Sequence, residues 1–176
     1  MIAMRLKIFL AAAAGCAAIA AASAQEAVSA LKGHDSNAPI DVSAQRLEVQ
    51  DRADRAIFAG DVHVSQGNLT LDTERLTVAY ASAGGVQIQR LDASGGVTVK
   101  SPSETARGDF GVYDLDKKLI TLVGSVRLSR GGSEISGSRL VIDLDSGRAV
   151  IDGGPAGVNQ TGGRVTGHFT VPKRGR

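Results

Sequence analysis

One strand pattern, written three times, constrains the fold of this chain more than any other feature. The stretch "IFAGDVHVSQG" begins at Ile57, and altered copies begin at Leu91 ("LDASGGVTVKS") and at Leu122 ("LVGSVRLSRGG"). In each copy apolar residues alternate with polar ones, which places the two kinds on opposite faces of a β-strand. Each copy also carries a glycine two residues before a valine. Repetition of such segments is typical of a sheet that grows by stacking similar units.

The recurring glycines and a second recurring motif share the same spacing. Gly60, Gly95 and Gly124 are 35 and then 29 residues apart. The second motif appears in "SAQRLEV", "DTERLTVAY", "ARGDFGVYDL" and "ISGSRLVIDL", and its anchor residues lie 29, 35 and 29 residues apart. Both series take the longer step across "YASAGGVQIQ", which predicts one enlarged turn there. The repeating unit is therefore a pair of strands, separated by turn clusters such as "SQGN", "DKK" and "DSG".

The alternation changes phase inside each unit. In "LTLDTERLTV" the apolar residues occupy odd positions over 69–71 and even positions over 76–78, and "EISGSRLVID" repeats the change. A shift of one residue turns every following side chain to the other face, so a bulge or corner must intervene. We expect the corner near Thr73 in the first case and near Gly137 in the second. Regular corners fold a long antiparallel sheet over on itself, so the expected fold class is all-β, without long helices after Ala24.

The first 24 residues have the features of a secretory signal peptide. Residues 1–7 carry two basic side chains and no acidic one, an apolar run covers 8–22, and Ala22-Ser23-Ala24 forms an A-x-A cleavage site. The run is shorter than the roughly 20 apolar residues that a membrane-spanning helix needs, which disfavours an uncleaved anchor. A lipoprotein modified at Cys16 is a second alternative. The expected organisation is a signal peptide (1–24), a flexible N-terminal segment (25–38), one domain (39–171) and a basic tail (172–176).

Composition excludes several classes of function for the mature chain. Cys16 is the one cysteine of the sequence and leaves with the signal peptide, so disulfides and thiol chemistry are not expected. Loss of Arg5 and Lys7 reduces the 20 basic residues to 18, against 18 acidic ones. A nearly neutral chain lacks the surplus positive charge of a nucleic-acid groove or an anionic-membrane patch, so no nucleic acid is expected as a partner. With no tryptophan, two tyrosines and four phenylalanines, the interior must consist of Val, Leu, Ile and Ala.

Three consecutive segments resemble a known family. "PIDVSAQRLEV", "AIFAGDVHVSQGNLTLDTERLTV" and "ETARGDFGVYDLDKKLITLVGSVRLSRGGSEISGSRLVIDL" resemble the OstA-like domain of the LptA periplasmic lipopolysaccharide-transport protein family. The resemblance covers Pro39 to about Gly153, and "RVTGHFTVP" is similar to the family's last strand. The chain departs from the family's pattern in two places: the "YASAGGVQIQ" loop is compact, and the segment after Val171 is short.

The resemblance implies a fold, a function and a set of partners. The implied fold is an open β-jelly roll, a folded-over antiparallel sheet that forms a V-shaped, solenoid-like trough for acyl chains. The implied protein is periplasmic and carries lipopolysaccharide from the inner to the outer membrane. Its protomers add edge to edge as a head-to-tail homo-oligomer and join LptC-like inner-membrane and LptD-like outer-membrane β-jelly roll domains.

Odd-numbered and even-numbered positions of a strand point to opposite faces of the sheet. The strands with the clearest alternation predict which of these positions face the lipid. We expect these lipid-binding residues on the inner face: Ile40, Val42, Leu47, Val49, Phe58, Val62, Val64, Leu76, Val78, Tyr80, Val97, Val99, Tyr113, Leu115, Ile120, Leu122, Val126, Leu128, Ile142 and Leu144. Such a surface contributes roughly 25 cal/mol for each Å² of apolar area that it buries. No catalytic group is needed for this function.

We expect no enzymatic activity, cofactor or metal site. His34, His63 and His168 are isolated from one another and from acid pairs at metal-ligand spacing. His63 alternates with Val62 and is expected on the solvent side of its strand. The acid pairs at 114/116 and 143/145 alternate with leucines and are expected near turns, as solvated charges on the outer face.

A different class of function fits the same alternation. A structural periplasmic β-solenoid that self-associates without carrying lipid has a closed, packed core, and a packed core shows the same pattern as an open trough. In both cases the first strand, near 40–43, and the last, near 165–171, are expected to stay free for pairing with another chain. Lipid binding by the purified protein distinguishes the two functions.

Overall fold

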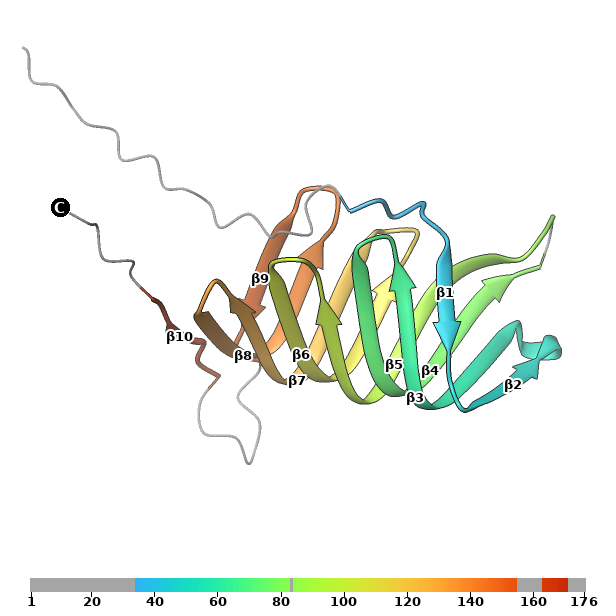
Figure 1. Cartoon of the computed structure of the whole chain (residues 1–176), viewed down its shortest axis with the longest axis horizontal. Helices are drawn as coiled ribbons and strands as arrows, with labels where there is room; N and C mark the ends of the chain where they lie inside the picture. The colour runs from blue at the N-terminus through green and yellow to red at the C-terminus, as the bar shows by residue number, and fades with distance from the viewer. Residues whose placement is uncertain (1–33, 83, 155–162, 171–176) are drawn as a thin grey trace, which may run out of the picture.

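The chain forms one open antiparallel sheet that is folded over on itself (Figure 1). The structure is a computed structural model that describes residues 34–82, 84–154 and 163–170. Ten strands and a single 3-10 turn are present in these residues: β1 (Ile40–Ser43), β2 (Arg46–Gln50), η1 (Asp51–Ala53), β3 (Arg55–Gln66), β4 (Leu69–Ala81), β5 (Gln87–Lys100), β6 (Glu104–Asp114), β7 (Leu119–Arg130), β8 (Ser133–Asp143), β9 (Arg148–Asp152) and β10 (Thr166–His168). The predicted all-β class is confirmed. The signal peptide, residues 25–33 and the basic tail lie outside the described residues.

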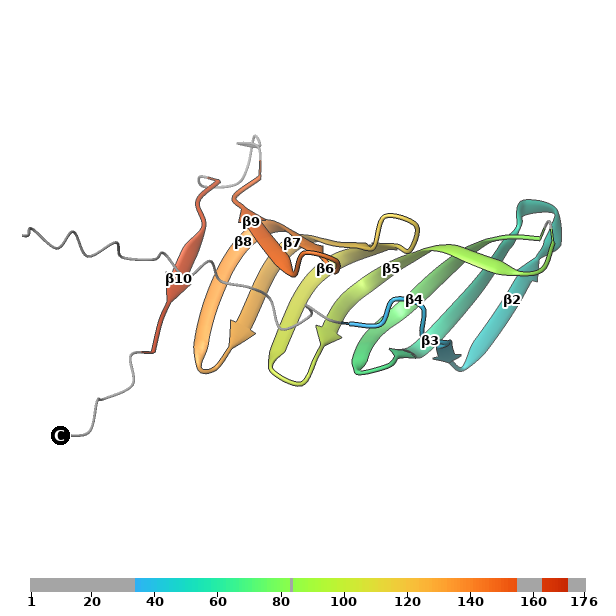
Figure 2. The same cartoon turned by 90° about the horizontal axis from the view of Figure 1, so that it is seen from above.

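The sheet has two arms because each central strand bends halfway along its length. The strand order is β1-β3-β4-β5-β6-β7-β8-β10, with β2 added to β3 and β9 added to β8. One half of β3 pairs with β1 and the other half with β2, and β8 divides in the same way between β10 and β9. We call the arm that contains β1 and β10 the first arm, and the arm that contains β2 and β9 the second arm. Figure 2 shows the strands running back and forth between the two arms, with β2 at one end of the molecule and β10 at the other.

Paired residues with left-handed backbone make the bend. Gly60–Asp61 in β3, Gly95–Gly96 in β5 and Gly124–Ser125 in β7 all have positive φ, and the register of the sheet shifts at each pair. These pairs are bulges, in which two residues oppose one residue of the neighbouring strand. A Cβ at Gly95 would lie 2.7 Å from the Cβ of Glu74, so this position needs glycine both for its φ of +87° and for space.

The predicted corners are confirmed, one residue from their expected positions. In β4 the register shifts between Thr73 and Arg75, and in β8 the corresponding shift lies between Gly137 and Arg139. Thr73 and Gly137 still pair with residues of the neighbouring strands. The single residue opposite each bulge is the one that follows Thr73 or Gly137 in the chain. The extra residue of each bulge belongs to the neighbouring, glycine-containing strand. The strand whose alternation changes phase therefore contains no bulge of its own.

The longer step of the repeat comes from the longest strands. β4 and β5 have 13 and 14 residues, and their pairing extends to Ala81 and Gln87 before the chain turns. The predicted enlarged turn is therefore the connection between these two strands, together with one extra stretch of ladder on the second arm.

Candidate functional site

The inner faces of the two arms form a continuous apolar interior. Most residues of the predicted lipid-facing set are buried there: Val62, Val64, Leu76, Val78, Val97, Val99, Tyr113, Ile120, Leu122, Val126, Ile142 and Leu144. Others are partly buried and pack against these: Ile40, Val42, Phe58, Leu115 and Leu128. Period-two alternation therefore identified the inward side chains, because each strand has one face against the opposite arm.

Two predicted residues lie on the inner face but remain exposed. Leu47 pairs with Phe58 and Val49 pairs with Ala56, which gives both side chains the inward orientation of their partners. They are 54% and 55% exposed because β2 is the last strand of the second arm. Tyr80 also lies toward this end, where it lines a groove together with Phe58 and Val78.

Some inward residues were missing from the prediction. Leu69 and Leu71 are buried in the first-arm half of β4, where parity is the reverse of that in the second-arm half. The phase shift of this strand was the signal that should have added them. Leu91 and Leu140 follow the parity of their own strands and were also missed, as was Gln66, whose polar side chain gave no indication of burial.

The interior is open at its two ends and nearly closed in the middle. A groove of about 680 Å³ lies at the β1–β2 end, lined by Val49, Phe58 and Tyr80 among others. A groove of about 570 Å³ lies at the β9–β10 end, where Ile151 and Phe169 are part of the lining. Between them the two arms pack together and leave a cavity of about 20 Å³, which has room for about one water molecule. An acyl chain could pass through the middle only if the arms separated.

A cluster of polar side chains lies in the middle of this apolar interior. The Tyr113 hydroxyl donates to Oε1 of Gln66 over 3.0 Å, and this bond joins the second arm to the first. His34 Nε2 lies 3.0 Å from the same oxygen. Burial raises the pKa of Tyr113, and hydrogen bonds with the side chains of Ser36 and Gln66 offset part of the rise. Residues 34–38, the end of the expected flexible segment, thus belong to this cluster.

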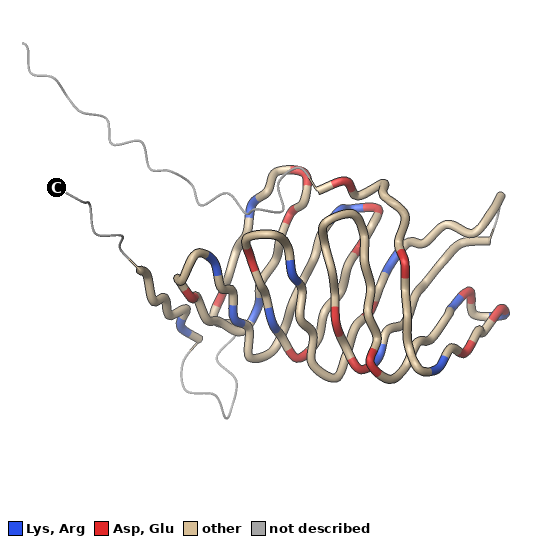
Figure 3. The backbone as a smooth tube through the Cα atoms, in the orientation of Figure 1, with Lys and Arg blue, Asp and Glu red and all other residues tan. Residues whose placement is uncertain are grey.

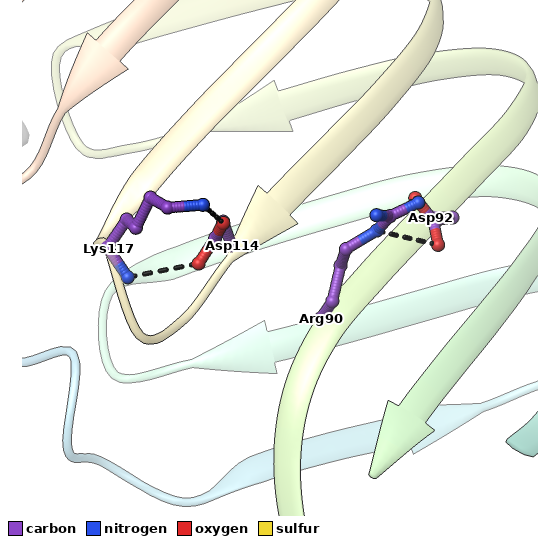
Figure 4. A network of polar contacts seen from close by, with 4 residues as sticks. All are labelled: Arg90, Asp92, Asp114 and Lys117. Carbon is purple, nitrogen blue, oxygen red and sulfur yellow. Dashed lines mark hydrogen bonds and ion pairs between the residues drawn. The ribbon is translucent and has the colours of Figure 1, made fainter. Parts of the chain in front are cut away.

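The outer face carries ion pairs near turns and strand ends. Arg90 donates to both carboxylate oxygens of Asp92, and Asp114 accepts from the backbone and the ammonium group of Lys117 (Figure 4). Hydrogen bonds from Lys117 lower the pKa of Asp114, and the hydrogen bond to Asp92 raises the pKa of Arg90. Asp143 likewise accepts backbone hydrogen bonds in its own turn. These acids stabilise turns and strands.

His63 lies on the outer face, as its alternation predicts. Its Nδ1 is 2.7 Å from Oδ1 of Asp72, whose other oxygen accepts from Lys100 over 2.8 Å. The hydrogen bond from Lys100, assisted by His63, lowers the pKa of Asp72. Both members of the His63–Asp72 pair are solvent-exposed, which limits what the pair contributes to stability.

Charged residues of both signs are interspersed along the strands and turns (Figure 3). Among residues 34–82, 84–154 and 163–170, there is no group of three or more His, Cys, Asp or Glu side chains that could hold a metal ion. The same residues include no helix long and apolar enough to cross a membrane.

Comparisons with known proteins agree with this architecture. Residues 41–148 match the family described as LptA/(LptD N-terminal domain) LPS transport protein. An uncharacterized protein of Rhizobium meliloti (strain 1021) is 35% identical in an alignment of 121 residues, which covers 65% of this chain and 65% of the length of that relative. The crystal structure of LptH, the LptA homologous periplasmic component of the lipopolysaccharide transport device of Pseudomonas aeruginosa, superimposes with a TM-score of 0.68. The match covers 78% of this chain and 99% of LptH at 19% sequence identity.

Proposed function

The chain belongs to the LptA/(LptD N-terminal domain) LPS transport protein family, and we propose on this premise that it is a periplasmic bridge that carries lipopolysaccharide from the inner to the outer membrane. The observation that supports this function best is the apolar interior that runs between the two arms and opens into a groove at each end. Ten buried methylenes contribute about 8 kcal/mol, from which the costs of ordering the chain and separating the arms are subtracted. Several acyl chains could therefore be held without a catalytic group.

Photocrosslinking from opposite faces of two strands, β3 and β7, tests the lipid-carrying role. A photoreactive residue at Val62 or Leu122, both on the inner face, should crosslink to lipopolysaccharide in cells. The same residue at His63 or Thr121, which point outward, should not. Equal labelling from both faces would contradict transport through the interior.

The proposal includes head-to-tail assembly of protomers through the ends of both arms. β2 runs toward the rim of the second arm and β9 runs away from it, so a β2 placed beside the β9 of another copy would be antiparallel to it. β1 and β10 have the same relation on the first arm. Each end also has exposed apolar side chains on its inner face, Leu47 and Val49 at one end and Val165 and Phe169 at the other. Strand addition at these edges would extend the interior into the next copy.

If strands pair across the junction as they do within the sheet, the rows of paired residues predict the register of the assembly. One row crosses the second arm from Arg46, through Phe110 and Val123, to Asp152. If the row continues into the next copy, Asp152 lies opposite the Arg46 of that copy. On the first arm the equivalent row begins at Asp41 and ends at His168. Cross-strand pairs of opposite charge stabilise a sheet by roughly 0.2–1 kcal/mol each.

A charge swap tests both the assembly and its register. Arg46→Asp or Asp152→Arg alone should place like charges opposite each other and shift the protein toward monomers in sedimentation velocity. The double variant R46D/D152R should restore the oligomers, since it reverses the pair without losing it. If the single variants assemble as well as the unmodified protein, this register is wrong.

Two further features of the proposed role follow from the family. The partners at the two ends of the bridge would be LptC-like and LptD-like β-jelly roll domains, which would add to the edges in the same way. The mature protein would begin at Gln25 after cleavage of the signal peptide, and N-terminal sequencing of the exported protein tests this.

The closed middle of the interior favours one alternative. A structural periplasmic β-solenoid would have a packed core throughout, as the middle of this molecule does. Purified protein that fails to bind lipopolysaccharide on a native gel, while it still forms oligomers, would support the structural role.

A further inference from the structure

The segment that precedes β1 lies across the middle of the interior. We call residues 34–39 the strap. Figure 1 shows it running along the top of the molecule toward β1. On the first arm, the Nε2 of Gln66 donates to the backbone carbonyls of Ser36 and Ala38, each over 3.0 Å. The side chain of Ser36 lies near enough to Tyr113, on the second arm, to offset part of the rise in its pKa that burial causes. The strap is therefore hydrogen-bonded to the first arm and lies beside the second, where the two arms face each other.

Gln66 is the centre of this arrangement and its position is unusual. It is only 3% exposed and belongs to the inner face of β3, which is otherwise apolar. Its amide nitrogen has both of its hydrogen bonds to the strap. Its amide oxygen accepts from Tyr113 and lies beside His34, whose other ring nitrogen is 3.4 Å from Asn68.

A buried amide cannot lose these partners without a large loss of stability. Burying a polar group without a hydrogen bond is unfavourable, so nearly all such groups in proteins are paired. Within the part of the chain that the structure describes, no buried side-chain nitrogen or oxygen lacks a partner. If the strap moved away, the Gln66 amide would need other acceptors inside the interior. Whatever replaces the strap must therefore supply hydrogen-bond acceptors to this amide, as either ligand oxygens or water does.

We propose that the strap occupies a polar subsite of the interior, and that an acyl chain with an amide or ester carbonyl displaces it on binding. This inference rests on the proposed lipid-carrying function and names the part of the ligand that is recognised. The strap presents two amide carbonyls to Gln66, and the linkage at the head of an acyl chain presents the same group. Gln66 and Tyr113 would bind that linkage, while the chain beyond it would enter the apolar interior.

The cavity beneath the strap fits this role. It is lined by Gln66 and Tyr113 at its polar side and by Ile40, Leu91 and Leu122 at its apolar side. At about 20 Å³ it cannot hold an acyl chain while the strap is in place. A ligand carbonyl that accepts from both Gln66 and Tyr113 would also replace the Tyr113–Gln66 hydrogen bond that joins the two arms, so entry of the ligand and separation of the arms would be coupled.

A reversible disulfide that fixes the strap tests the inference. A Cβ built on Gly67 would lie 3.9 Å from the Cβ of Ala38, which is within the range of Cβ separations in disulfides. The variant A38C/G67C, in a Cys16→Ala background, can be studied oxidised and reduced in the same preparation. Oxidation should lower its affinity for purified lipopolysaccharide about tenfold or more, because the binding-competent form becomes rare. Reduction should restore binding.

A matched pair of cysteines at another site controls for two effects: the oxidation treatment itself, and the replacement of a turn glycine by cysteine. Gly132 also has a positive φ, and its Cβ would lie 3.8 Å from the Cβ of Thr170. The variant G132C/T170C would fix the C-terminal segment beside the β9–β10 groove and leave the strap free, so oxidation should lower its binding far less than the tenfold expected for A38C/G67C. Equal binding by oxidised and reduced A38C/G67C would overturn the strap inference while the proposed function stood. Absence of binding by the unmodified protein would overturn both.

The chemistry of the subsite has its own test. N-decanoyl-N-methylglucamine and decyl glucoside have the same chain length, and only the first has an amide carbonyl. In competition with a hydrophobic fluorescent probe, the unmodified protein should prefer the amide by about 3- to 10-fold, the worth of one or two hydrogen bonds. Gln66→Leu should abolish this preference, and because it also frees the strap, it should bind the glucoside at least as strongly as the unmodified protein does. An unmodified protein without any preference would contradict recognition of the carbonyl.

Discussion

Truncation of Leu122 tests whether the two faces of the central strands are assigned correctly. Leu122 lies on the inner face of β7 with 0% exposure, and it pairs with Gly111 and Leu140 on the neighbouring strands. Its Cδ2 lies 3.0 Å from where a Cβ of Gly111 would be, so it fills the space that this glycine leaves. Leu122→Ala removes three buried carbons, worth about 2.4 kcal/mol at about 0.8 kcal/mol each. The cavity left behind raises the expected loss to about 3–4 kcal/mol.

The next residue along β7 is the matched control. Val123 points outward with 44% exposure, so Val123→Ala should destabilise the protein by less than about 1 kcal/mol. Urea unfolding followed by far-UV circular dichroism measures both variants. With an m-value of about 2 kcal/mol per molar urea, the midpoint should fall by about 1.5–2 M for Leu122→Ala and by less than about 0.5 M for Val123→Ala. Similar shifts for the two variants would refute the assignment of the inner face.

Three other predictions concern the bend, the polar cluster and the free edge. Gly95→Ala should destabilise the protein more than Gly96→Ala, because both residues have left-handed backbone but only a Cβ at Gly95 would contact Glu74; comparison of the two urea midpoints tests this. Burial raises the pKa of Tyr113 above its usual value of 10.0, so the folded state holds this proton more tightly than the unfolded state does. Stability should therefore be complete below about pH 10 and fall as the pH rises above it, and a Tyr113→Phe variant with the same alkaline unfolding profile would contradict this. Proline substituted at positions 41, 42 and 43, one position at a time, should block strand addition at the position whose backbone N–H points outward. If every variant forms the same oligomers in sedimentation velocity, pairing through β1 is excluded.

The sequence by itself determined the strands, their inner faces and the repeat. These properties depend on neighbouring residues, since alternation indicates which side of a strand is buried and the repeated glycines indicate where the backbone bends. The phase shift in β4 predicted a corner within one residue of its observed position. The residues of β2 had the correct face, but their exposure followed from the absence of a further strand, which alternation does not report.

Only the tertiary structure decided what happens between the arms. Gln66 and Tyr113 are 47 residues apart and His34 and Gln66 are 32 apart, so no local pattern joins them into one cluster. The closed middle and the open ends depend on how near the two arms approach, and a packed core and an open trough have the same alternation. Distances between the arms are set by side chains far apart in the chain, and that is why the strap and the subsite that it fills were visible only after folding.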